Sequence, residues 1–480
     1  MKKSVLSAIA LVFCLSLAQA QQMTLQECVR VGLSNNLTVR RALYNVKSNE
    51  VGLFQAKGNF LPTINANGSF NQNFGRNLNP LTYTYVNNVT KSINPNVSAS
   101  LLLFNGLRLQ NTYRQNKKNV EASDLDFEKA KNDVIITVVT NYTNVILNKE
   151  LFENAKYQLN SSQQQLERIQ KQVAAGALPK SNELTQEATV ATNETNLIIQ
   201  ENIYNLSLLQ LKQSMQLPAS NNLEVVVPDI TMEDMTINQT PEEIYDISVK
   251  TLPQVKSALL KVEAAQFAIG AAKGSLYPRI SLGSSAASNY SSASDGTVRY
   301  SSDPSTYSKA PVNGLYDATN QPIYQFAPTP GVTPLVTTNY GVGNQLSDYL
   351  SKNIGISVNL PVLNGLQNRA NVKQAFINRE LADITVKETE NALRQSIETA
   401  YNNAFAAAKT YTAALKQVSA NQEAFRMTQQ RHENGAATYI EYQVASNDLF
   451  SAKSSLARAK YNFILTKKIL EFYQGKTIEY

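Results

Sequence analysis

The sequence predicts a mainly α-helical protein with a smaller β-sheet portion, built from two copies of one plan. Three observations predict this class: landmark motifs that recur, long stretches without proline or glycine, and four segments in which apolar and polar residues alternate. The segment 56–62 (AKGNFLP) recurs as 272–278 (AKGSLYP), 216 residues later. Gly106 and Gly176 recur as Gly365 and Gly435, 259 residues later, so the second copy holds an insertion of 43 residues. We therefore expect a pseudo-symmetric scaffold.

The order of these motifs predicts the domain boundaries. Residues 1–20 combine Lys2 and Lys3 with an apolar run and Ala18-Gln19-Ala20, the pattern of a secretory signal peptide. The first structural repeat is then expected at 21–218, a connector at 219–239, the second repeat at 240–475 and a short tail at 476–480.

Each repeat is expected to open with short helices. Thr24 and Glu27 form a capping-box pattern, and Thr240 and Glu243 repeat it with Pro241 at the first helical position. In the connector, Leu223, Val225 and Val227 predict a short strand.

Two strands are expected to follow the short helices of each repeat. Residues at every second position are apolar in the segments 64–70, 97–103, 280–282 and 354–360, whereas Asn, Ser and Gly predominate between them. The loops between the paired strands are expected at 75–94 and at 284–352. The second is rich in Ser, Tyr, Pro, Gly and Thr and contains the insertion, so it predicts a long surface loop facing outward.

Two helical hairpins are expected to complete the repeats. Residues 107–175 contain no proline or glycine, which predicts one helix of roughly 100 Å. A break at 175–179 precedes a helix at 181–216, and the second repeat places the same elements at 366–434 and 438–473. Because their surfaces are too polar for lipid, we expect these helices to pack as coiled coils.

Composition excludes most catalytic chemistry. The chain has one histidine, His432, and outside the signal segment one cysteine, Cys28, so no metal site, cofactor or nucleophilic pair is expected, and we predict no enzyme. The formal net charge is +7, and the basic residues read as scattered over solvated helical surfaces, so no nucleic-acid partner is expected.

The predicted strands require an assembly. A sheet with one apolar face can span a lipid bilayer only as a closed barrel, which needs about eight strands or more. Four strands per chain therefore predict that several chains pool their strands. The Asn- and Ser-rich face would then line a water-filled lumen, the apolar face would contact lipid, and the long helices would extend the conduit.

The ordered repeat, the two hairpins and the Gly-Ala turns resemble the TolC-type outer-membrane efflux protein family over residues 24–475. The resemblance implies a homotrimer with a twelve-stranded barrel in outer-membrane lipid and an α-helical barrel in the periplasm. It also implies an exit duct for efflux or type I secretion, with a periplasmic adaptor and an inner-membrane pump as partners.

The resemblance also implies two kinds of site near the helix turns. Adaptor docking would use two sets of turn residues: Gly176, Ala177 and Leu178, and Gly435, Ala436 and Ala437. The pore constriction would use Glu441 and the position of Val444, so at most one of two acidic rings is retained. The positions of an ion pair between the hairpins hold Asn182 and Ala437, which cannot form it, whereas Glu183 and Arg431 lie nearby and could substitute.

Bland interpretations of these residues stay open: a simple helix break at each turn and a solvated carboxylate at Glu441. Two other classes also stay open, namely a periplasmic coiled-coil adaptor or structural protein, and an adhesin or receptor that displays the 284–352 loop. The exported cargo and the pump it serves cannot be read from the sequence.

Overall fold

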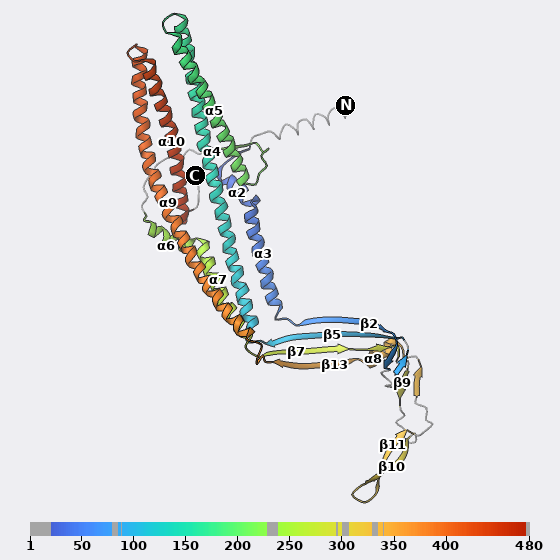
Figure 1. Ribbon diagram of the computed structural model, residues 1–480. Coiled ribbons are helices and arrows are strands. Elements are labelled where there is room, and N and C mark those ends of the chain that lie inside the picture. The colour runs from blue at the N-terminus through green and yellow to red at the C-terminus, as the bar shows by residue number, and fades with distance from the viewer. Residues whose placement is uncertain are drawn as a thin grey trace, which may run out of the picture. The chain divides into compact units, whose positions relative to one another are not determined.

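Figure 1 shows the protein as a computed structural model, which describes residues 21–78, 85–87, 89–227, 239–293, 296–299, 307–328, 335–338 and 340–476. The expected signal peptide, most of the connector and most of the C-terminal tail lie outside these residues. The chain divides into two compact units, and each unit draws on both repeats. Unit 1 comprises Met1–Phe54, Tyr113–Ile269 and Gln374–Tyr480, and unit 2 comprises Gln55–Thr112 and Gly270–Lys373.

The two repeats match helix for helix. The short helices are α2 (Leu25–Asn35), α3 (Leu37–Gly58), α6 (Pro241–Thr251) and α7 (Pro253–Gly274). The long helices are α4 (Arg108–Ala174), α5 (Lys180–Ser214), α9 (Gln367–Glu433) and α10 (Tyr439–Tyr473). Both α4 and α9 have 67 residues, and both α5 and α10 have 35. These bounds keep the two sequence offsets throughout, which confirms the duplicated plan.

The helix starts follow the predicted caps. Thr24 and Thr240 each accept a hydrogen bond from the backbone N–H of the glutamate three residues later, and that glutamate accepts one from the backbone N–H of the threonine. The expected continuous passage from 241 to 272 is broken at Leu252, because Pro253 cannot donate the hydrogen bond that would join α6 to α7.

The cores of unit 1 also follow the repeat. Cys28, Val138 and Leu211 are buried together in the first repeat, and their equivalents Ile244, Ile397 and Leu470 are buried together in the second. Cys28 thus occupies an isoleucine position and serves as a small core residue. Desolvation by burial raises the pKa of its thiol to about 12, which disfavours the reactive thiolate. Beside this core, β1 (Gln21–Met23) pairs in parallel with β6 (Leu223–Val225), the strand predicted in the connector.

Unit 2 is built on an antiparallel sheet whose long strands have the order β13-β7-β5-β2 (Figure 1). These strands are β2 (Thr63–Asn73), β5 (Thr90–Phe104), β7 (Arg279–Ala287) and β13 (Ser351–Asn359), with the short β8 (Tyr290–Ser291) beside β5. The four predicted strands are confirmed. The predicted alternation in β5 fails at Leu103, because a bulge after Leu102 places Phe104, not Leu103, opposite Ile280.

The two predicted loops are corrected in their bounds and content. Instead of starting at Gly75 and ending at Asn94, the first contains β3 (Arg76–Leu78) paired with β4 (Tyr85–Asn87), and β5 already begins at Thr90. In the second, β7 continues to Ala287 and β13 begins at Ser351. Between them lie β9 (Gly296–Arg299) paired with β12 (Leu335–Thr338), β10 (Tyr307–Tyr316) paired with β11 (Pro322–Pro328), and α8 (Val342–Asp348). A composition rich in Ser, Tyr and Thr suits strands as well as loops, which is why the prediction missed them.

Within the described part of the chain, no helix combines the length and the apolar character needed to cross a membrane.

Candidate functional site: the helix turns and the two-faced sheet

The two long hairpins turn in the same way. At the end of α4, Gly176 has φ 74°, and the N–H of Ala177 donates to the carbonyl of Gln172 at 2.8 Å. At the end of α9, Gly435 has φ 73°, and the N–H of Ala436 donates to the carbonyl of Arg431 at 2.7 Å. This is the Schellman arrangement, which needs a left-handed residue after the helix. A Cβ at either glycine would meet no atom within 4 Å, so the backbone angle, not space, favours glycine here.

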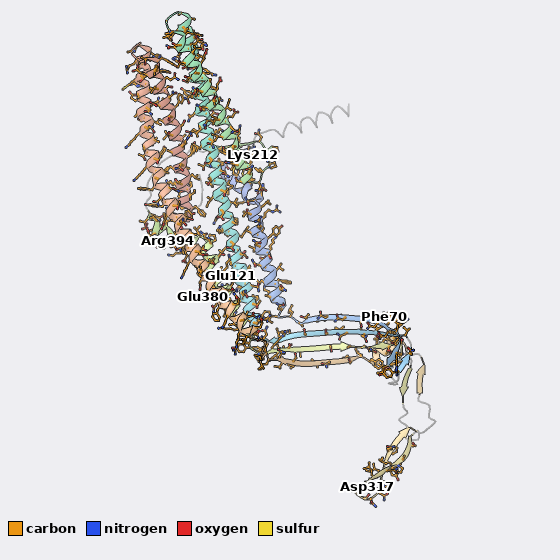
Figure 2. The ribbon with its side chains drawn as sticks, viewed as in Figure 1. Phe70, Glu121, Lys212, Asp317, Glu380 and Arg394 are labelled. Carbon is orange, nitrogen blue, oxygen red and sulfur yellow. The ribbon has the colours of Figure 1, made fainter. Side chains whose placement is uncertain are left out.

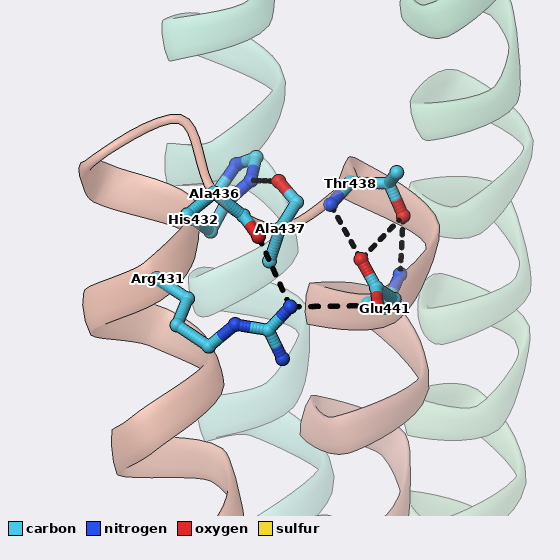
Figure 3. Close-up of polar contacts among 6 residues, drawn as sticks. All are labelled: Arg431, His432, Ala436, Ala437, Thr438 and Glu441. Atoms are coloured by element: carbon cyan, nitrogen blue, oxygen red, sulfur yellow. Dashed lines mark hydrogen bonds and ion pairs between the residues drawn. The ribbon is translucent and has the colours of Figure 1, made fainter.

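The second turn carries a polar network that the first turn lacks (Figure 3). Glu441 accepts from the backbone N–H of Thr438 at 2.6 Å and from its hydroxyl at 3.0 Å, and the hydroxyl accepts from the Glu441 N–H at 3.3 Å. These bonds lower the pKa of Glu441, with a smaller contribution from the charge of Arg431. The carboxylate therefore caps α10 and remains half exposed. Val444, the second predicted constriction position, is also exposed.

The suggested substitute ion pair between Glu183 and Arg431 is not formed. Glu183 lies 2.7 Å from Lys180 on its own helix. The Arg431 guanidinium donates to the carbonyl of Ala436 at 3.0 Å and lies 3.9 Å from Glu441 (Figure 3). Each charge thus finds a partner on its own hairpin. His432 contacts the Ala437 carbonyl through Nδ1 at 3.1 Å.

Uncharged residues link the hairpins instead, and the sequence analysis missed them. The Tyr439 hydroxyl on α10 donates to the side-chain carbonyl of Gln186 on α5. Gln186 is buried and donates to the carbonyl of Ser162 on α4 at 2.7 Å, and Gln443 donates to Thr189 at 3.0 Å. A small polar cavity of about 30 Å³ lies among these residues. The available signal was the polar side chain of Gln186 in the buried stripe of α5, where an apolar residue is the norm.

The sheet of unit 2 has two faces of opposite character. Register places Ile64 opposite Ala99, Leu101 opposite Leu282, and Leu282 opposite Ile356 on one face. The other face pairs Asn65 with Ser98 and Asn67 with Asn96. The apolar face is solvent-exposed: Ile64 is 67% exposed, Ile356 67% and Phe70, labelled in Figure 2, 63%. Exposed apolar area of this extent indicates a surface that contacts lipid or protein.

Both edges of this sheet are open. Among the described residues, β2 pairs only with β5 and β13 pairs only with β7, so each edge strand has a row of backbone groups without strand partners. Such edges are templates for another strand.

The distribution of charge differs from the expectation of a scattered surface. Unit 2 contains 11 Lys and Arg against 4 Asp and Glu, whereas unit 1 contains 33 of each. The whole formal charge of +7 therefore belongs to unit 2. Moreover, the strands β2, β5, β7 and β13 contain no acidic residue.

In the described ranges, no group of three His, Cys, Asp or Glu side chains is arranged to hold a metal ion.

A duplicated chain with a two-faced, open-edged sheet and two long helical hairpins defines the class of TolC-like channel proteins. The family described as outer membrane efflux protein matches residues 17–215 and 248–475, and the chain belongs to that family. The chain is 25% identical over 114 residues to the outer membrane protein TolC of Escherichia coli, a match that covers 24% of this chain and 23% of TolC. It is 20% identical to the proteases secretion protein PrtF of Dickeya chrysanthemi over 99% of this chain and 92% of PrtF.

A solved structure shares the fold. The outer membrane protein VceC of Vibrio cholerae superposes with a TM-score of 0.73 at 13% identity, over 95% of this chain and 97% of VceC.

Proposed function

We propose that this chain is one protomer of an outer-membrane exit duct, which conducts solutes passively from a periplasmic adaptor and inner-membrane pump to the exterior. Family membership and the full-length likeness to a protein named for protease secretion support this function. The observation that carries the proposal is the sheet of unit 2, with one polar face, one exposed apolar face and two open edges. In lipid, open edges are tolerated only when other strands pair with them.

The internal repeat supports a specific pairing between protomers. Within the chain, β5 of the first repeat pairs with β7 of the second. The equivalent pairing joins β13 of the second repeat to β2 of the first, and these are the two edge strands, so it requires another copy of the chain. Applying the repeat offsets to the β5–β7 register places Ile356 opposite Phe70, and Asn359 opposite Asn67, on that copy. Both pairs keep apolar with apolar and polar with polar.

The helix ends support the same assembly. Gly106 and Gly274 pack so closely that a Cβ on Gly274 would lie 2.8 Å from the Gly106 carbonyl oxygen. Their equivalents Gly365 and Gly58 have no such neighbours within 4 Å in the single chain. A second copy would bring these two glycines together. Exposed apolar residues on α9 and α3 would be covered by the same contact: Ile377, Leu381, Ile384, Tyr44 and Val51. Three copies would supply the twelve strands of a closed barrel.

The helix turns are the proposed periplasmic end. The exposed small residues Gly176, Ala177, Gly435 and Ala436, with Leu178 and Ala437 beside them, leave room for close approach of an adaptor. Exposed Leu184 and Ile440 add apolar area next to these turns. We also propose that Glu441 and Val444 surround the constriction, with Glu441 as an acidic ring.

A cysteine cross-link tests the assembly. Asn67→Cys combined with Asn359→Cys should yield covalent trimers on a non-reducing gel, whereas either single variant should not. Within one chain these positions are separated by two further strands, roughly 14 Å, which a disulfide cannot bridge. The matched control combines Asn73→Cys, at the far end of β2, with Asn359→Cys. Cross-linking of the control as efficiently as the test pair would contradict the proposed register.

Conductance tests the duct itself. The purified protein in a planar lipid bilayer should form water-filled pores of uniform conductance, because the polar face would line the lumen. A protein that stays soluble once the outer membrane is removed, and that conducts no ions in the bilayer, would favour a periplasmic adaptor instead.

A further inference from the structure

A cavity of about 560 Å³ in unit 2 lies at the end of the sheet where the long helices begin. Residues of the polar face, such as Ser100, Ser281 and Asn359, line it on the side of the strands. Its volume lies in the range of small-molecule binding sites. The cavity therefore opens on the face that the proposed function assigns to the lumen.

Two arginines line this cavity, and no acidic residue does. Arg108 is the first residue of α4, and Arg279 is the first residue of β7, where it faces the same way as Ser281 opposite Asn359. Both side chains are exposed, and neither guanidinium has an ion pair or hydrogen bond with another described residue. Two unpaired guanidiniums beside each other's element, without a carboxylate nearby, create a positive potential.

The packing of the two repeats holds these arginines in place. Gly274 allows Arg108 to approach so closely that a Cβ on the glycine would lie 2.9 Å from the Arg108 Cβ. Asn105 accepts a hydrogen bond from the backbone N–H of Leu109 at 3.4 Å, and Asn368 donates to the carbonyl of Ser275 at 2.7 Å. The start of α4, the end of α7 and the start of β7 thus form one fixed surround for the cavity.

We infer that Arg108 and Arg279 form an anion-binding collar that favours passage of solutes carrying carboxylate or phosphate groups. Guanidinium binds both groups through paired N–H donors, and asparagine amides in the same cavity add neutral donors. Arg279 is the only charged residue on the polar face of the four long strands, so nothing along those strands opposes this preference. The inference rests on the proposed duct, in which each protomer contributes both arginines to the lumen.

Bilayer recordings of the full-length protein under a potassium chloride gradient test this collar. The wild-type pore should show a reversal potential on the chloride-selective side, relative to the variant Arg108→Gln/Arg279→Gln. Lysine at both positions should retain the preference, since it keeps the charge. The matched control is Lys91→Gln/Lys352→Gln, which removes two positive charges from the same unit on the apolar face and should leave the reversal potential unchanged.

Added probes then separate the two anionic groups. Citrate presents carboxylates and pyrophosphate presents phosphates, and whichever class is bound should block the wild-type pore reversibly and the glutamine variant less. Pores with the same reversal potential and the same block in the wild type and the glutamine variant would overturn the collar and leave the duct standing. Absence of pores in every variant and in the wild type would overturn the duct as well.

Discussion

The first and second repeats have the same backbone but different neighbours and different polar side chains. Helix lengths agree residue for residue, and the left-handed glycines 106 and 365, and 176 and 435, agree within a few degrees. The capping box of Thr438 and Glu441 faces Pro179 and Asn182 in the first repeat, which has no side-chain cap. The bond between Tyr439 and Gln186 likewise has no counterpart, because Lys180 and Ala445 stand at the equivalent positions. A few residues fix the shared fold, and the remaining positions diverge for each repeat's surroundings.

The glycines at the ends of α7 and α3 should give the largest contrast. Gly274→Ala places a methyl group against the backbone of Gly106 and Arg108, so we expect the free energy of unfolding to fall by about 3 kcal/mol, the upper part of the range for overpacking. Gly58→Ala, at the equivalent position, meets nothing in the single chain and should stabilise the protomer slightly. Urea unfolding of the monomeric protein in detergent measures both. Equal losses in the two variants would contradict the packing described for this junction.

The same Gly58→Ala variant sharpens the comparison once the chain assembles. In the proposed trimer Gly58 meets Gly365 of another copy, so the added methyl should reduce the trimer fraction measured by light scattering. A variant that forms trimers as fully as the wild type would show that the two repeats do not form equivalent junctions.

The shared backbone could be predicted from the sequence because a few residues determine it locally. Proline and glycine end helices, threonine with glutamate starts them, and alternation marks strands. The sheet faces followed from the same alternation. The strands within 284–352 could not be predicted, since their pairing depends on partners far along the chain. The collar was missed for a related reason: Arg108 and Arg279 are 171 residues apart in sequence and meet only through packing of the two repeats.

The bond between Tyr439 and Gln186 should give the next effect. Tyr439→Phe leaves the side-chain carbonyl of buried Gln186 without this donor, so the free energy of unfolding should fall by about 1–2 kcal/mol. Lys180→Ala changes the equivalent position of the first repeat, where no link between the hairpins exists, and should have a smaller effect.

Alkaline pH tests the burial of this tyrosine. Desolvation, with a smaller effect of Tyr442, raises the pKa of Tyr439 to about 12. Since the folded pKa is raised, the stabilising contribution is complete below the ordinary value of 10.0 and is lost as pH rises through about 12. Tyr439→Phe should reduce this alkaline loss. An unchanged profile would place the titration on other tyrosines.

The cap of α10 should give a smaller effect, confined to the second turn. Thr438→Ala removes the hydroxyl that accepts from the Glu441 N–H, and loss of such a cap costs about 1 kcal/mol. Pro179→Ala, at the equivalent position, removes no side-chain cap. Thermal unfolding of both variants provides the comparison, and equal shifts in their midpoints would mean that the cap contributes nothing specific.

The smallest effect should come from protonation of Glu441. Its pKa is lowered, chiefly by the backbone N–H of Thr438 and then by the threonine hydroxyl, so only the charged form is fully bound. A lowered folded pKa means that the stabilising contribution is present above the ordinary value of 4.5 and is lost as pH falls through the lowered value. Amide hydrogen exchange, corrected for its intrinsic pH dependence, should therefore show weaker protection of the first turn of α10 on acidification. Glu441→Gln should remove this response. If the glutamine variant kept it, the acid sensitivity would arise elsewhere in the hairpin, and the polar difference between the two turns would not determine how tightly each helix begins.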